Sequence, residues 1–395
     1  MFGTPTCVPE ECAELVPALR TGHTAILEAL QAAGLAAPPY PQHLPAGNPE
    51  GTAAARAFVM QGVLKYHGLA DWDWRTAYLP SISLNNDAAQ TLTWVQFDPR
   101  LAADEVTIGG VPASGREQER VVRCLQFVRE QAHITSRARV LTRNQLNGGT
   151  ADSSAKGLGT SASGSAALAM AALTAAFGPQ LGAHPRLLTC TARLLAGSGC
   201  RSAAGGLALW LSYPGIAHAD SYAVRLDLSD ALRDVRLLTV PLPSRAGLRT
   251  EAAHLDAPRS SFFGAWLQSR TAEVLQCLGA AQRGDWQCLG EWAELDSIRL
   301  HGVTMSGSRT NKIFAWEPEN ILLFRMCNAL RSAGTPVYCS TDTGPTAVFI
   351  TSAQHADAVA QAINATLPGA AVVRGGIGGP AQIVDALVAR QQLEQ

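Results

Sequence analysis

KGLGTSASGSAALAMAAL, residues 156–173, is the stretch of sequence that decides the fold. Glycines and small hydroxyl residues lead directly into a run rich in alanine, the residue with the highest helix propensity, so the pattern predicts a helix over residues 161–177. The N-terminus of a helix offers unpaired backbone N–H groups and a partial positive charge. Because glycines let the backbone close around a ligand, this helix start is suited to bind a phosphate.

Three hydroxyl side chains, those of Thr160, Ser161 and Ser163, add hydrogen-bond donors to the same turn. The alternative interpretation is an ordinary helix start whose small residues allow close packing. The stretch matches neither the P-loop pattern GxxxxGK[ST] nor a GxGxxG that follows a strand. The sequence therefore supports neither of those nucleotide-binding folds.

Three further segments carry residues that could do chemistry. In GSGCRS, residues 197–202, Arg201 follows a glycine-rich turn and could bind a carboxylate or phosphate through two hydrogen bonds, or form a structural ion pair. Asp342 follows a predicted strand and precedes Gly344, so it is either catalytic or a turn-forming residue. Lys65, Tyr66 and His67 stand at a predicted strand end, where His67 is either a base, a ligand or structural.

Composition and charge exclude several classes of protein. The chain has 395 residues, of which 47% are hydrophobic, and a formal net charge of −1, so we expect a buried core and no binding to nucleic acid. The longest weakly polar stretch, residues 161–178, is mostly alanine and does not predict a membrane span, and we expect no secretory signal at the N-terminus. The nine cysteines form no CxxC pair, which favours free thiols in a reducing cytoplasm.

Helical and strand patterns alternate in both halves of the chain, which predicts an α+β protein. Residues 1–50 read as an accessory N-terminal segment and linker, residues 51–242 as a first domain and residues 243–395 as a second. Residues 261–300 are expected to be mostly helical, and residues 141–159, with their glycines and hydroxyl residues, are expected to form a loop.

Taken together, these segments resemble the mevalonate diphosphate decarboxylase branch of the GHMP kinase superfamily over about residues 53–390. That family carries a KYWGK-like strand end, a Pro-x-SxS-like strand, a GLASSASG phosphate loop, a GSGSACRS segment followed by GG, and a late DAGPN. Their counterparts here are KYHGL of residues 65–69, PSIS of residues 80–83, GLGTSASG of residues 157–164, GSGCRS of residues 197–202 and DTGP of residues 342–345. The CRS and D-x-GP motifs point to the decarboxylase branch specifically.

The resemblance implies a two-domain GHMP kinase fold, with an N-terminal ATP-binding domain, a C-terminal ferredoxin-like domain and the site in the cleft between them. It implies ATP-dependent decarboxylation of a phosphorylated 3-hydroxy-3-methyl acid, mevalonate 5-phosphate or 5-diphosphate, with ATP and Mg²⁺ as cofactors. Asp342 would help the 3-hydroxyl attack the γ-phosphate, Arg201 would hold the carboxylate and Lys65 would stabilise charge. The resemblance further implies that the substrate is bound by Tyr66, His67, Gly197 and Ser198. It implies that ATP is bound by Gly157, Gly159, Thr160, Ser161, Ala162 and Ser163, and the metal by Ser161. We also expect a cytoplasmic homodimer.

Several residues depart from the family pattern. Leu69 stands where the family has its second lysine, and Ala196 replaces the first serine of GSGSACRS. His67 replaces tryptophan, and the resulting KYHG form is similar to the archaeal-type phosphomevalonate decarboxylases. Because the first two positions grip the 5-diphosphate in the family, we expect a substrate with fewer phosphates, unless another cation, Arg259 or Arg270, compensates. An apparent insertion over residues 147–156 precedes the phosphate loop, and Thr346 stands in place of the family's asparagine.

Three other functions stay open from the sequence. They are a GHMP kinase that phosphorylates without decarboxylation, an ATP-dependent decarboxylase of a non-isoprenoid 3-hydroxy acid, and a non-catalytic binding relative. The pairing of Asp342 with Arg201 argues against the kinase, because a kinase does not need to hold a carboxylate.

Overall fold

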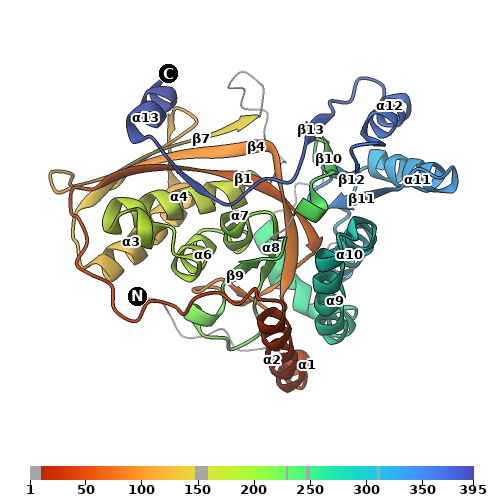
Figure 1. Cartoon of the computed structure of the whole chain (residues 1–395), viewed down its shortest axis with the longest axis horizontal. Helices are drawn as coiled ribbons and strands as arrows, with labels where there is room; N and C mark the ends of the chain where they lie inside the picture. Colours follow the sequence, from red (N-terminus) through yellow and green to blue (C-terminus); the bar gives the residue numbers. More distant parts are fainter. Residues whose placement is uncertain (1–9, 147–158, 228–229, 246–249, 309–311) are drawn as a thin grey trace.

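The computed structural model describes residues 10–146, 159–227, 230–245, 250–308 and 312–395. It contains two main β-sheets with helices packed against both (Figure 1), which confirms the predicted α+β class. A separate two-stranded sheet joins β2 (Leu69–Asp71) to β3 (Thr76–Ala77).

The first sheet has eight strands and is built around two long antiparallel strands, β1 (Thr52–Leu64) and β4 (Ser81–Asp98). The order β14-β1-β4-β7-β5-β6 forms its main path, and β8 pairs with β4 and with β9. The bounds of the other strands are β5 Glu105–Ile108, β6 Val111–Pro112, β7 Arg137–Leu146, β8 Leu207–Trp210, β9 Ala223–Arg225 and β14 Gln382–Val384.

Helix α4 (Thr160–Phe177) is the central helix of the molecule and confirms the helix predicted from the opening stretch. It packs against β1 and β4, and its alanines are buried on nearly every side. Such small side chains let a helix approach a sheet closely. By length and composition α4 could cross a membrane, yet most of it is buried inside the protein, as expected for a core helix.

The two faces of the first sheet carry different helices (Figure 1). One face is covered by α4 together with α3 (Gly115–Ala132), α6 (Pro185–Arg193) and α7 (Gly199–Ala204), and the short α5 (Pro179–Gly182) follows α4. The other face receives α13 (Ala386–Glu394). Side chains alternate between faces along a strand, so Ala53 and Ala55 of β1 join the α4 core while Ala54 lies in the cluster beneath α13.

The second sheet has four strands in the order β11-β12-β10-β13, all antiparallel. Their bounds are β10 Val235–Val240, β11 Val337–Thr341, β12 Ala347–Ser352 and β13 Val373–Gly375. Helices α11 (Pro318–Ser332) and α12 (Ala356–Thr366) share its hydrophobic cluster. Strand β10, which precedes residue 242, therefore belongs to the second sheet. Strand β14, near the end of the chain, belongs to the first. The domain division at residue 242 stays a prediction.

Long helices connect the two sheets, as predicted for residues 261–300. Helix α9 (Phe263–Arg283) packs on α10 (Trp286–Gly307), and α10 contacts both β1 and β11. The helix α8 (Thr250–Asp256) and the 3₁₀ turn Ala257–Arg259 precede them, and two other 3₁₀ turns span His218–Asp220 and Asp230–Leu232.

The N-terminal segment forms α1 (Glu10–Ala13) and α2 (Val16–Ala32), and α2 packs against α9. Gly22 of α2 makes this close approach possible, because a Cβ there would lie 2.1 Å from Thr271 Oγ1. The accessory segment is therefore tied to the body of the protein through a helix–helix contact.

The expected loop over residues 141–159 is wrong at its beginning. Strand β7 continues to Leu146 and stays in register with β4, from Asp98 opposite Arg137 to Ala89 opposite Leu146. Because β4 supplies a long partner strand, ladder hydrogen bonds override the weak local preference of this polar stretch. The predicted insertion over residues 147–156 lies outside the described residues.

Candidate active site

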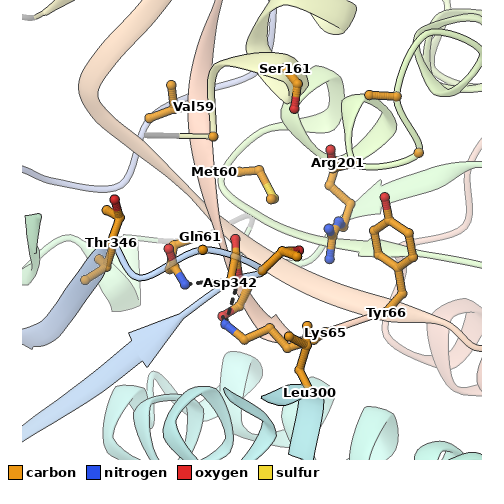
Figure 2. A pocket seen from close by; sticks show the side chains of 18 of the residues that line it. Val59, Met60, Gln61, Lys65, Tyr66, Ser161, Arg201, Leu300, Asp342 and Thr346 are labelled. Atoms are coloured by element: carbon orange, nitrogen blue, oxygen red, sulfur yellow. Dashed lines mark hydrogen bonds and ion pairs between the residues drawn. The ribbon is translucent and has the colours of Figure 1, made fainter. Parts of the chain in front are cut away.

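A cavity of about 610 Å³ lies where the first sheet, the second sheet and the N-terminus of α4 meet. Residues from the end of β1, the turn between β11 and β12, and helices α3, α4, α7, α8 and α10 line it. Its lining includes Lys65, Tyr66, Ser161, Arg201 and Asp342 (Figure 2). Segments that are far apart in the sequence therefore bring these five predicted residues to one cavity.

Lys65 and Asp342 form the ion pair at the centre of this cavity. Lys65 Nζ lies 2.9 Å from Asp342 Oδ1, and the two side chains are 2% and 33% exposed, respectively. The same ammonium group donates to Gly62 O at 2.6 Å and to Ser340 Oγ at 2.7 Å. Burial lowers the pKa of Lys65, while the charge of Asp342 and its hydrogen bond act in the opposite direction.

Arg201, on α7, is a buried cation with spare hydrogen-bond donors. It is 2% exposed, and within the part of the chain that the structure describes its Nε and Nη1 have no hydrogen-bond partner. Its guanidinium lies over the ring of Tyr66, 5.4 Å from the centroid, and burial lowers the pKa of Arg201. A buried charge without a carboxylate partner is costly, so the arrangement is suited to an anionic ligand entering the cavity.

Tyr66 is itself held by aromatic neighbours. Its ring stacks on His254 of α8 at a centroid distance of 5.4 Å and meets Trp210 edge to face at 4.9 Å. Burial lowers the pKa of His254 to about 4, which keeps that imidazole uncharged beside the arginines. Tyr66 thus forms a rigid wall of the cavity.

The start of α4 presents backbone to the cavity. Gly159 has a left-handed φ of 76°, and a Cβ there would lie 3.1 Å from Met60 O, so glycine lets the turn pass close to β1. Gly159 and Ser161 line the cavity. In contrast, Ser163 is fully buried and bonds Thr91 Oγ1 at 2.7 Å, since its position on the helix faces the sheet.

The other predicted residues divide between the cavity and the core. Gly197 and Ser198 line the cavity, whereas Thr160 and Ala162 do not, and Gly157 lies outside the described residues. His67 does not line it either: it is fully buried and its Nε2 lies 3.3 Å from Thr304 Oγ1.

The two departures from the family pattern, Leu69 and Ala196, both line the cavity, as does Thr346. Arg259 and Arg270, the two cations expected to compensate for these departures, do not line the cavity. Arg270 is fully buried and binds Asp296 at 2.9 Å, and Arg259 is mostly exposed beside Asp256.

Three other arginines line the cavity and were missed from the sequence: Arg75, Arg116 and Arg120. Arg116 and Arg120 are four residues apart on α3 and share a face, a spacing that could have found them. Arg75 gives no such signal. It has a φ of 51°, rare for a residue with a Cβ, and burial together with Arg120 lowers its pKa to about 10.

The arginines differ in their partners. Arg116 forms an ion pair with Glu251 of α8. Arg75 Nε has no hydrogen-bond partner among the described residues. The cavity therefore has a cationic end, separate from the Lys65–Asp342 pair, with capacity to bind an anion.

No protein metal cage is evident in the described ranges, where no group of three or more His, Cys, Asp or Glu side chains could hold a metal ion. Mg²⁺ favours a few oxygen ligands together with substrate phosphates. The hydroxyl of Ser161, beside the open N–H groups of α4, fits such a shared arrangement.

The chain is also similar to known proteins. Residues 57–223 match the family model of the diphosphomevalonate decarboxylase-like N-terminal domain. The chain is 33% identical over 334 residues to a phosphomevalonate decarboxylase of Haloferax volcanii, which covers 84% of this chain and 98% of that relative.

Two solved structures are similar as well. Mevalonate diphosphate decarboxylase from Staphylococcus aureus superposes with a TM-score of 0.76 at 27% identity, covering 85% of this chain and 98% of that one. A structure described as MDDEF in complex with MVAPP, AMPPCP and magnesium gives a TM-score of 0.76 at 27% identity, with 85% and 99% covered.

Proposed function

The chain belongs to the mevalonate decarboxylase family, and from this premise we propose that it converts mevalonate 5-phosphate, with ATP, to isopentenyl phosphate and CO₂. It is an enzyme of the decarboxylase type and acts on mevalonate phosphates in the mevalonate pathway. The observation that carries the proposal is the buried, partly unpartnered guanidinium of Arg201 in the same cavity as the Lys65–Asp342 pair.

Asp342 accepts the proton of the tertiary 3-hydroxyl while that oxygen attacks the γ-phosphate of ATP. Lys65 orients this carboxylate through its 2.9 Å contact. Arg201 holds the substrate carboxylate. Phosphoryl transfer releases ADP. When the C–O bond to the new 3-phosphate breaks, inorganic phosphate leaves with that electron pair, the electron pair of the C–C bond to the carboxylate forms the alkene, and CO₂ is released.

ATP and Mg²⁺ are the cofactors, and the start of α4 fits them. The turn at Gly159 and the hydroxyl of Ser161 would hold the ATP phosphates, and Ser161 would also bind Mg²⁺, which neutralises phosphate charge when bound. The N–H groups of Thr160 and Ser163 belong to the same first turn, so these residues can contribute backbone donors even though their side chains do not line the cavity. The N–H of Ala162 already donates to Gly159 O at 3.1 Å, so Ala162 would contribute only by keeping this turn small.

The monophosphate is proposed over the diphosphate for two reasons. The Haloferax volcanii relative is a phosphomevalonate decarboxylase. In addition, Leu69 and Ala196 line the cavity and offer no charge-assisted hydrogen bond to a second phosphate. We assign the 5-phosphate to the cationic end, where Arg75 and Arg120 face the cavity together with Tyr66.

The proposal extends to the whole molecule. Residues 51–242 would carry the ATP-binding half and residues 243–395 the half that supplies Asp342. Gly197 and Ser198 would contact substrate beside Tyr66, and His67 would support that wall from the core.

We further propose a homodimer in the cytoplasm, where ATP is available and where the eight described cysteines, all of which are free, stay reduced.

Competition between substrates tests the proposal. Equal amounts of mevalonate 5-phosphate and 5-diphosphate are mixed with ATP and Mg²⁺, and the products are followed by mass spectrometry. We expect isopentenyl phosphate to form first. Preferential use of the diphosphate would contradict the substrate assignment, and a 3-phosphate that accumulates without alkene would instead indicate a kinase.

A further inference from the structure

Gln61, near the end of β1, is a buried polar residue that the roles above do not use. It is 5% exposed, and its Nε2 donates to Asp342 Oδ1 at 3.1 Å and to Ser340 Oγ at 2.9 Å. An amide nitrogen has two hydrogens, so both are used. Figure 2 shows Gln61 and Lys65 both directed at Asp342.

Lys65 completes the network. Its three ammonium hydrogens match its three acceptors, Gly62 O, Ser340 Oγ and Asp342 Oδ1. Ser340 Oγ, which accepts from both Lys65 and Gln61, donates to Gly62 O at 3.1 Å. Every donor hydrogen of this network therefore has an acceptor, and these shared hydrogen bonds hold Lys65, Gln61 and Ser340 in one arrangement.

The strand backbone keeps this network compact. A Cβ at Gly62 would lie 2.7 Å from Lys65 Cδ and 2.9 Å from Asp342 Oδ1. The glycine therefore lets Lys65 and Asp342 pack directly over β1, within reach of Gln61 on the preceding position.

Both donors meet the same carboxylate oxygen. Oδ1 of Asp342 accepts hydrogen bonds from Lys65 Nζ and Gln61 Nε2, whereas Oδ2 accepts none from the described residues. The Asp342 side chain is one-third exposed and lines the cavity. Two donors on one oxygen fix the rotation of the carboxylate and leave the other oxygen as a free acceptor.

We propose that Gln61 is a positioning residue that holds the Asp342 carboxylate with Oδ2 toward the substrate hydroxyl. A neutral amide is suited to this role, because it orients the carboxylate without the added positive charge that would weaken it as a base. The inference rests on the proposed function for its catalytic consequence, but the orientation of the carboxylate can be measured separately.

The test compares Gln61→Met, which keeps the length of the side chain and removes both donors, with Gln90→Met as the matched control. Gln90 is a partly buried glutamine of the same sheet whose amide bonds Gln145, and it does not line the cavity. Steady-state kinetics, thermal midpoints and crystal structures are obtained for the wild type and both variants.

Gln61→Met is expected to lower kcat about 10- to 100-fold, the range set by one hydrogen bond to a charged group, with KM for either substrate changing less than about threefold. Gln61→Glu, which loses the same donors and adds a negative charge, is expected to be at least as slow. Gln90→Met should match the wild type in kcat.

The crystal structures separate this inference from the proposed function. In Gln61→Met the carboxylate should rotate away from its wild-type orientation. An inactive wild type would defeat the proposed function, and the rotation would still decide the role of Gln61. An unrotated carboxylate, an unchanged kcat, or a kcat loss accompanied by a drop in thermal midpoint much larger than that of Gln90→Met would overturn the inference.

Discussion

The two ends of the cavity differ in whether their charged side chains already have hydrogen-bond partners. At one end, Lys65 and Asp342 lie in a network whose donors all have acceptors. At the cationic end, Arg75 Nε has no partner in the described part of the chain. Arg201, which lies close enough to Asp342 for their charges to interact, likewise has two nitrogens without one. A satisfied network is arranged before substrate arrives, whereas unsatisfied cations gain their partners only when an anion binds. The difference separates the residues for chemistry from those for recognition.

Removing the charge of Asp342 should have the largest effect on turnover of the proposed substitutions. Asp342→Asn keeps the size of the side chain but loses the base, so we expect turnover to fall 10²- to 10⁴-fold with little change in ATP affinity. Turnover assays and nucleotide titration check this result. Near-normal turnover would remove Asp342 from the mechanism.

Stability measurements compare Arg201, which is proposed to bind the substrate, with Arg270, which forms ion pairs within the protein core. Arg270→Met removes the 2.9 Å ion pair of buried Asp296 and leaves it only the longer 3.6 Å contact with Arg299, so it should cost about 3–5 kcal/mol in the free energy of unfolding. Arg201→Met removes a buried charge that lacks a carboxylate partner and should cost less than about 1 kcal/mol in the ligand-free protein. Urea unfolding of both variants gives the two values. Equal losses would mean that Arg201 is structural.

Changing the cationic capacity of the recognition end should alter substrate choice. Leu69→Lys introduces a charge-assisted donor, and we expect the ratio of kcat/KM to move about tenfold or more toward the diphosphate. Leu69→Met serves as the control and should keep the original ratio. No shift in Leu69→Lys, with folding intact, would show that Leu69 does not set the choice.

The smallest effect is expected at the start of α4. Ser161→Ala removes one donor to a charged phosphate and should raise the KM for ATP about tenfold. The fold should survive, because Ser161 lines the cavity and Ser163 remains in its buried bond with Thr91. Unchanged ATP kinetics would favour a purely structural role for this turn.

Much of the molecule could be predicted from the sequence because its motifs are local. The alanine-rich run fixed α4 to within one residue, and Lys65, Arg201 and Asp342 stand in short patterns that the resemblance matched. Gln61 and Arg75 could not be found in this way. Gln61 depends on strand β11 arriving beside β1, and Arg75 depends on a left-handed backbone that no local pattern predicts.

His67 illustrates the same limit from the other direction. It stands inside a recognised motif, yet the chain turns its ring into the core against Thr304 rather than into the cavity. A motif predicts which segment reaches the site, whereas tertiary packing decides which side chains of that segment face the ligand.

The most direct test of the central claim is the ratio of CO₂ to ADP in a single reaction. The wild-type protein is given mevalonate 5-phosphate labelled at the carboxylate, with ATP and Mg²⁺, and both products are counted over time. Because Arg201 is assigned to the carboxylate and Asp342 to the hydroxyl, the account predicts one CO₂ for each ADP. ADP released without CO₂ would contradict it and identify the protein as a kinase.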